Sequence, residues 1–144
     1  AHNIETVPRL YPAIRPGADY RRSLELLRAA GRSAHGARTK SALMLGLGEK
    51  RDEVYETLAD LRAAGVDCVA VGQYLRPGLE QEPVREYVPP AVFEALAQRA
   101  GRMGFLETTA GPLVRSSYRE GGADSERAPG PARSDRERSK EEAR

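Results

Sequence analysis

Helical and strand-like spacings of hydrophobic residues alternate along most of this chain. Tyr20 and Leu24 lie four residues apart and begin a stripe that predicts an amphipathic helix. Asp19 is placed to cap the start of this helix, and Gly31 is placed to end it. The uninterrupted apolar run from Ala42 to Leu45 follows, which predicts a strand buried on both faces.

The same pair of patterns then repeats. Val54 and Leu58 fall on one helical stripe, and Gly65 stands where this second helix should end. A second buried strand is predicted from Cys68 to Gly72. Two consecutive helix–strand units of this kind favour parallel strands with helices packed against the sheet.

A long connection, residues 73–88, separates the second strand from a third helix. Pro89 and Pro90 open that helix, and Gly104 is placed to end it. Residues 105–114 look irregular, with a short strand at most. Two strands and a marginal third would leave unpaired edges and cannot close a barrel, so we interpret residues 1–118 as part of a larger α/β domain.

The position of the strands also predicts where a ligand would bind. In parallel α/β folds the ligand site lies at the carboxyl ends of the strands. Here those ends are residues 46–49 and residues 73–77. We therefore expect any binding site to be built from these two segments.

Composition changes markedly after residue 118. Residues 119–144 contain no Leu, Ile, Val, Phe or Met, and 14 of these 26 residues are charged. A segment of this kind buries too little apolar surface to offset the entropy lost on ordering. Residues 119–144 are therefore predicted to form a disordered charged tail, and only residues 1–118 are predicted to fold.

Charge and hydropathy exclude several classes of partner. The formal net charge of +2 leaves no basic surface typical of nucleic-acid binding. No apolar run approaches the length needed to span a bilayer, so a cytoplasmic protein without a membrane partner is expected.

Cys68 lies in an apolar run, which favours a buried, inert thiol. The two histidines, His2 and His35, lack the neighbours of a metal or triad site.

The glycine turn after the first strand admits two interpretations. Residues 46–51 match neither the Rossmann fingerprint nor a P-loop, because Arg51 replaces the third glycine and no Ser or Thr follows Lys50. The turn is either a plain strand-to-helix connection or a place where a ligand approaches the backbone closely. Together with its strand, it resembles the G-x-I-x-G-x-x-E pattern of radical S-adenosylmethionine enzymes, with Ala42 and Met44 as replacements.

Six short segments, in order along the chain, look like parts of one family. They are His2 to Arg9, Arg15 to Tyr20, Thr39 to Ser41, Gly46 to Glu49, Gly72 to Leu75 and Gly111 to Tyr118. Their order and spacing resemble those of lipoyl synthases, and the last segment contains the family's terminal R-S-S-Y. The resemblance implies the C-terminal portion of a partial (β/α)6 TIM-type radical S-adenosylmethionine barrel.

The resemblance also implies roles for individual residues. Asn3 and Glu5 would lie near the ribose or methionyl group of S-adenosylmethionine, and Met44 and Gly46 beside its adenine. Gln73 and Tyr74 would line the cofactor or substrate cavity. Ser117 would be an oxygen ligand to the auxiliary [4Fe–4S] cluster. Arg115 would either hold an anionic group or brace the terminal segment.

For the complete protein, the resemblance implies lipoyl synthase activity. Two [4Fe–4S] clusters and S-adenosylmethionine would serve to insert sulfur at C6 and C8 of an octanoyl-lysine group. The partners would be an octanoylated lipoyl carrier domain or H protein and a reducing electron donor. The segment from Arg76 to Gly78 departs from the family's usual Gln-Pro-Ser, which affects the expected carrier contacts.

Neither cysteine motif of the family occurs here, and Cys68 matches no position in either motif. We therefore expect this chain alone to be inactive and of marginal stability. A non-catalytic module that binds a lipoyl carrier domain is the alternative. An unrelated α/β domain whose glycine turn binds phosphate is a third interpretation.

Overall fold

The computed structural model describes residues 1–33 and 38–117. The predicted tail, Tyr118 and His35 therefore lie outside the described residues. Within the described ranges, no helix has the length and apolar character needed to cross a membrane.

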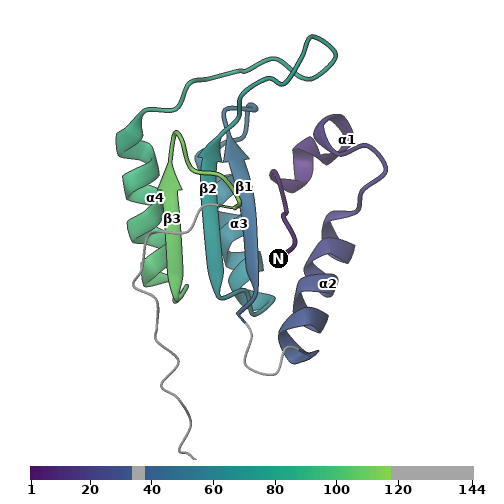
Figure 1. The fold of residues 1–144 in the computed structure, drawn as a ribbon, viewed down its shortest axis with the longest axis vertical. Helices are drawn as coiled ribbons and strands as arrows, with labels where there is room; N and C mark the ends of the chain where they lie inside the picture. Colours follow the sequence, from purple (N-terminus) through teal and green to yellow (C-terminus); the bar gives the residue numbers. More distant parts are fainter. Residues whose placement is uncertain (34–37, 118–144) are drawn as a thin grey trace, which may run out of the picture.

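Three parallel strands form one sheet in the order β1-β2-β3 (Figure 1). Their bounds are Lys40–Leu45 for β1, Cys68–Gln73 for β2 and Glu107–Gly111 for β3. The N-terminal segment runs along the edge of β1 that does not pair with β2. The backbone amide of Glu5 donates to the Ala42 carbonyl at 3.0 Å, and the Met44 amide donates to the Glu5 carbonyl at 2.9 Å. This segment extends the sheet at the β1 edge.

From α2 onward, helices and strands alternate along the chain. Their bounds are Pro8–Leu10 for the 3-10 helix η1, Tyr11–Ile14 for α1, Tyr20–Ser33 for α2, Arg51–Ala63 for α3 and Pro90–Arg102 for α4. Asp19 caps α2 as predicted, because its Oδ1 accepts from the Arg22 amide at 2.8 Å. The parallel α/β class is thus confirmed, and the marginal third strand is a regular one.

The prediction that Gly31 ends the first helix is wrong, because α2 continues to Ser33. A glycine weakens a helix by about 1 kcal/mol and does not by itself stop it. The glycines that do follow a helix end, Gly65 after α3 and Gly104 after α4, adopt a left-handed backbone with φ of +81° and +92°.

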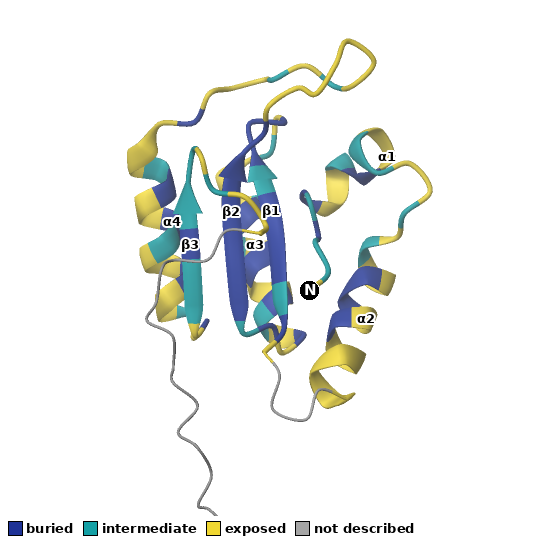
Figure 2. Cartoon of the chain, in the orientation of Figure 1, coloured by how far each residue is buried: buried dark blue, intermediate teal, exposed yellow. Residues whose placement is uncertain are grey.

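One face of the sheet packs against the helices and forms the core. Leu43, Val69 and Val71 point into a cluster with Leu58 of α3 and Phe93 of α4. Figure 2 shows β1 and β2 buried along most of their length. Side chains alternate between the faces of a strand, so the opposite face carries the intervening residues. Beyond Lys40, Cys68 and Glu107 at the start of the strands, that face is lined mainly by small side chains, with Met44 as the largest: Ala42, Met44, Ala70, Gly72, Thr109 and Gly111.

Candidate functional site

The carboxyl half of the sheet and the segment after β3 enclose a cavity of about 250 Å³. Its lining comes from the N-terminal segment, from β1 and β2, and from residues 114–116. Four residues that were predicted to contact the cofactor contribute to it, namely Asn3, Glu5, Met44 and Gln73. The fold thus collects these separated side chains around one space.

Two larger cavities open beside the first. Ser117 borders one of about 440 Å³ together with Asn3 and Glu5. Tyr74 borders the other, of about 490 Å³, again together with Glu5. The predicted iron ligand is therefore a neighbour of the predicted cofactor-binding residues, and Glu5 is common to all three cavities.

Glu5 holds an unusual backbone conformation at this junction. Among the described residues it is the non-glycine residue with a left-handed φ, at 69°. Such a conformation costs about 1–2 kcal/mol in a residue with a Cβ. It is held in place by the two hydrogen bonds to β1 and by the preceding residue, since the Ile4 amide donates to Ser41 Oγ at 3.1 Å. Strain of this kind is typical of functional sites.

The glycine turn after β1 is braced by its own carboxylate. The amides of Gly46 and Leu47 donate to the two oxygens of Glu49 at 2.7 and 2.9 Å. Gly46 has a φ of +99°, and a Cβ there would lie 2.3 Å from Gln73 Nε2 and 2.4 Å from the Glu86 carbonyl oxygen. The close approach at Gly46 is therefore occupied by the protein itself.

Gln73 connects this turn to the long loop that follows β2. Its Nε2 donates to the carbonyls of Tyr74 and Glu86 at 3.0 Å each, and its Oε1 accepts from the Val88 amide at 2.9 Å. The Tyr74 hydroxyl donates to the Glu82 carbonyl at 2.8 Å. Both side chains thus order residues 74–88, while their remaining surfaces face the cavities.

The terminal segment carries exposed serines over the open face of the sheet. Ser116 and Ser117 are both exposed, whereas Val114 is partly buried. Arg115 Nη1 donates to the Val114 carbonyl at 2.8 Å, which is the bracing role considered for this residue. The alternative role, binding of an anion, would use the other guanidinium nitrogens of Arg115.

The described residues supply little for a metal cluster. Within residues 1–33 and 38–117, no group of three His, Cys, Asp or Glu side chains could hold a metal ion. Cys68 is buried at the start of β2, with its Sγ 3.9 Å from Glu107 Oε2. Burial raises the pKa of this thiol, and the Glu107 carboxylate raises it further. Cys68 also begins β2, whereas Ser117 follows the end of β3, so the two do not share a site.

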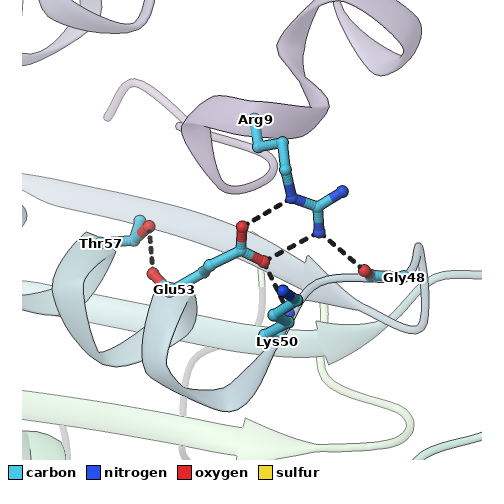
Figure 3. A network of polar contacts seen from close by, with 5 residues as sticks. All are labelled: Arg9, Gly48, Lys50, Glu53 and Thr57. Atoms are coloured by element: carbon cyan, nitrogen blue, oxygen red, sulfur yellow. Dashed lines mark hydrogen bonds and ion pairs between the residues drawn. The ribbon is translucent and has the colours of Figure 1, made fainter.

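A polar clamp that the sequence did not reveal joins the N-terminal segment to the glycine turn (Figure 3). Arg9 Nε and Nη2 donate to the two carboxylate oxygens of Glu53 at 2.7 and 2.9 Å, and Nη2 also donates to the Gly48 carbonyl. The Lys50 amide donates to the same carboxylate at 2.7 Å. Glu53, in the first turn of α3, thus joins the 3-10 helix η1 to the turn that follows β1.

The clamp predicts a specific acid sensitivity. Hydrogen bonds from Arg9 and then from the Lys50 amide lower the pKa of Glu53 to about 2, from an ordinary 4.5. Its stabilisation is therefore complete above pH 4.5 and is lost as the pH falls from 4.5 towards 2. Thermal unfolding of the chain across this range should show a steeper loss of stability than in Glu53→Gln.

Glu56→Gln is the matched control, because Glu56 is exposed on the same helix. This variant should follow the acid profile of the unmodified chain. An identical profile for Glu53→Gln would show that the clamp does not form in solution.

No protein-family model matches the chain. Curated proteins do resemble it closely. It is 57% identical over 121 residues to the lipoyl synthase of Acidothermus cellulolyticus, covering 84% of this chain and 37% of that protein. It is 57% identical over 117 residues to the lipoyl synthase of Methylococcus capsulatus, covering 81% of this chain and 36% of that protein. With the lipoyl synthase of Mycobacterium avium it shares 54% identity over 121 residues, with 84% and 39% covered. The chain thus spans little more than a third of these relatives.

Proposed function

Because this chain belongs to the lipoyl synthase family, we propose that residues 1–118 form the C-terminal part of a partial (β/α)6 catalytic barrel. Three parallel strands, with an N-terminal segment beside β1, agree with such a part. In the complete protein this part would help to convert octanoyl-lysine on a carrier domain into a lipoyl group.

One observation carries this proposal: the terminal serine segment and the N-terminal polar residues border a common space. Ser117, Asn3 and Glu5 line the same cavity although they come from opposite ends of the described chain. This is the juxtaposition expected if a cluster ligand and the S-adenosylmethionine contacts serve one reaction.

The first cavity has the chemistry to hold S-adenosylmethionine. The small side chains of Ala42 and Ala70 leave room above the sheet for a flat ring. Met44 offers a polarisable surface for adenine, and Asn3 and Glu5 offer hydrogen-bonding groups for the ribose or methionyl end.

The other predicted cofactor residues have a supporting position. Gln73 and Tyr74, which border the first cavity and the 490 Å³ cavity respectively, would shape the loops around the cofactor. Gly46 lines none of the three cavities and would act only through its close approach to Gln73. S-adenosylmethionine and two [4Fe–4S] clusters, when bound, supply the radical that removes hydrogen at C6 and C8 and the sulfur that replaces it.

The described residues do not by themselves fit an iron–sulfur cluster. Ser117 contributes one hydroxyl oxygen, and the remaining ligands must come from another part of the complete protein. Ser117 would thus complete a site at the surface of this segment. A reducing electron donor, an octanoylated lipoyl domain or H protein and a cytoplasmic location follow from the same proposal.

A chimaera tests the function directly. Residues 1–117 of this chain would replace the matching segment of the Acidothermus cellulolyticus lipoyl synthase, with which the chain is 57% identical. With S-adenosylmethionine, a reductant and an octanoyl-lysine peptide, the chimaera should form lipoyl product, detected by mass spectrometry. A folded chimaera that carries its clusters but yields no product would contradict the proposal, and retained carrier binding would then favour a non-catalytic module.

The chain alone should neither assemble a cluster nor form product. Anaerobic treatment with iron and sulfide, followed by visible absorbance and iron analysis, should leave no stoichiometric cluster on it. A stoichiometric cluster would overturn the view that the missing ligands lie elsewhere.

A further inference from the structure

Gly72 lies where the terminal segment crosses the sheet. It occupies a regular position in β2, paired with Met44 of β1 and Gly111 of β3. A Cβ at Gly72 would lie 2.2 Å from the Val114 carbonyl oxygen and 3.2 Å from its carbon. Its φ lies outside the left-handed region, so the backbone conformation does not require glycine here. The close approach of Val114 does.

Val114 packs against two glycines on neighbouring strands, Gly72 of β2 and Gly111 of β3. The Val114 amide donates to the Gly111 carbonyl at 3.1 Å, which turns the chain back over the sheet. A Cβ on Gly111 would lie 3.4 Å from Val114 Cγ2, at the edge of ordinary contact. We refer to Gly72 and Gly111 as the glycine seat. Figure 1 shows the segment after β3 passing in front of β2 towards β1.

We infer that Gly72 is a positioning residue for Ser117. The absence of a side chain at Gly72 sets how closely residues 114–117 approach the sheet, and thereby places Ser117 beside Asn3 and Glu5. This inference rests on the proposed role of Ser117 for its catalytic consequence, although the seating of Val114 is independent of that role.

A methyl group at Gly72 must displace the terminal segment. Cβ atoms essentially never come within 3.0 Å of another heavy atom, so the Val114 carbonyl would have to move by about 1 Å. The obstacle is a backbone carbonyl, which cannot swing aside as a side chain can. A displacement of about 1 Å in a reacting group is enough to lower a rate by up to about 100-fold.

Hydrogen exchange in the chimaera tests the seat itself. Gly72→Ala should increase exchange of the Val114 amide, which donates to the Gly111 carbonyl, by about tenfold, the effect of a strain in the usual range, while β1 and β3 stay protected. Gly101→Ala is the control, because a Cβ there meets no atom within 4 Å. Gly111→Ala should have a smaller effect than Gly72→Ala. Equal protection of the Val114 amide in Gly72→Ala and the parent would overturn the inference.

A truncation keeps the test decisive if Gly72→Ala folds poorly. Ending the chimaera after Gly111 removes Val114, so Gly72→Ala should then leave the urea unfolding midpoint unchanged or raise it. A destabilisation of the same size with and without residues 112–117 would contradict the seat.

Activity separates this inference from the proposed function. If Ser117 acts as proposed, Gly72→Ala should lower sulfur insertion by tenfold or more. Faster exchange of the Val114 amide with unchanged sulfur insertion would uphold the seat and count against the role of Ser117.

Discussion

Replacing Ser117 by cysteine in the chimaera should preserve its iron content and slow sulfur insertion by about tenfold or more, equivalent to about 1.4 kcal/mol on the activation barrier. A serine oxygen is a harder and poorer ligand for iron than a thiolate. A weak ligand at this position would favour loss of iron when sulfur is donated. A thiolate in its place should hold the iron more tightly and oppose that loss.

Ser116→Cys is the matched control for this prediction, because Ser116 is equally exposed and borders the same cavity. Iron and sulfide content, 5′-deoxyadenosine release and lipoyl formation would be measured for both variants. Release of 5′-deoxyadenosine should stay near the parent value in each. Sulfur insertion at the parent rate in Ser117→Cys would sink the idea that a weak ligand matters.

Local patterns predicted the elements of this fold because their causes are local. Val54 and Leu58 lie on one helical stripe, and both are buried in α3. Gly31 shows the limit of such reasoning. Whether a glycine ends a helix depends on its φ, which the chain's later course determines and which composition does not reveal.

The location of the site was predictable in part, because strand ends in parallel sheets share one edge. Residues 73–77 border the cavities as expected, whereas residues 46–49 line none of the three. Asn3, Met44 and Gln73 do line a common cavity. Their individual roles are a different matter. The Gln73 side-chain amide forms hydrogen bonds to the loop after β2, and the same amide fills the space beside Gly46.

The features that the sequence did not reveal depend on distant pairs. Arg9 and Glu53 are 44 residues apart and form their clamp because two loops meet at the strand ends. Nothing in a helix's charge pattern distinguishes this carboxylate from a solvated one. Likewise, the sequence predicts Gly72 only as a glycine within a strand, and its close contact with Val114 is evident only from the structure.

Gly46→Ala should destabilise the folded chain by about 3 kcal/mol or more. Alanine at a φ of +99° is strained, and its Cβ would lie 2.3 Å from Gln73 Nε2 and 2.4 Å from the Glu86 carbonyl oxygen. Relief of these contacts requires Gln73 to leave its hydrogen bonds to the connection after β2. The loss should appear as a lower urea midpoint, or as absence of a cooperative transition, in circular dichroism.

Gly101→Ala provides the opposite expectation in the same experiment. Gly101 lies in α4 with no atom within 4 Å of an added Cβ, so alanine should stabilise the chain by about 0.5–1 kcal/mol. If both variants instead shift the midpoint alike, the Gly46 turn is not packed against Gln73 as described. Loss of stability confined to Gly46→Ala would show that this glycine is required by the protein's own packing at the strand end, before any ligand binds.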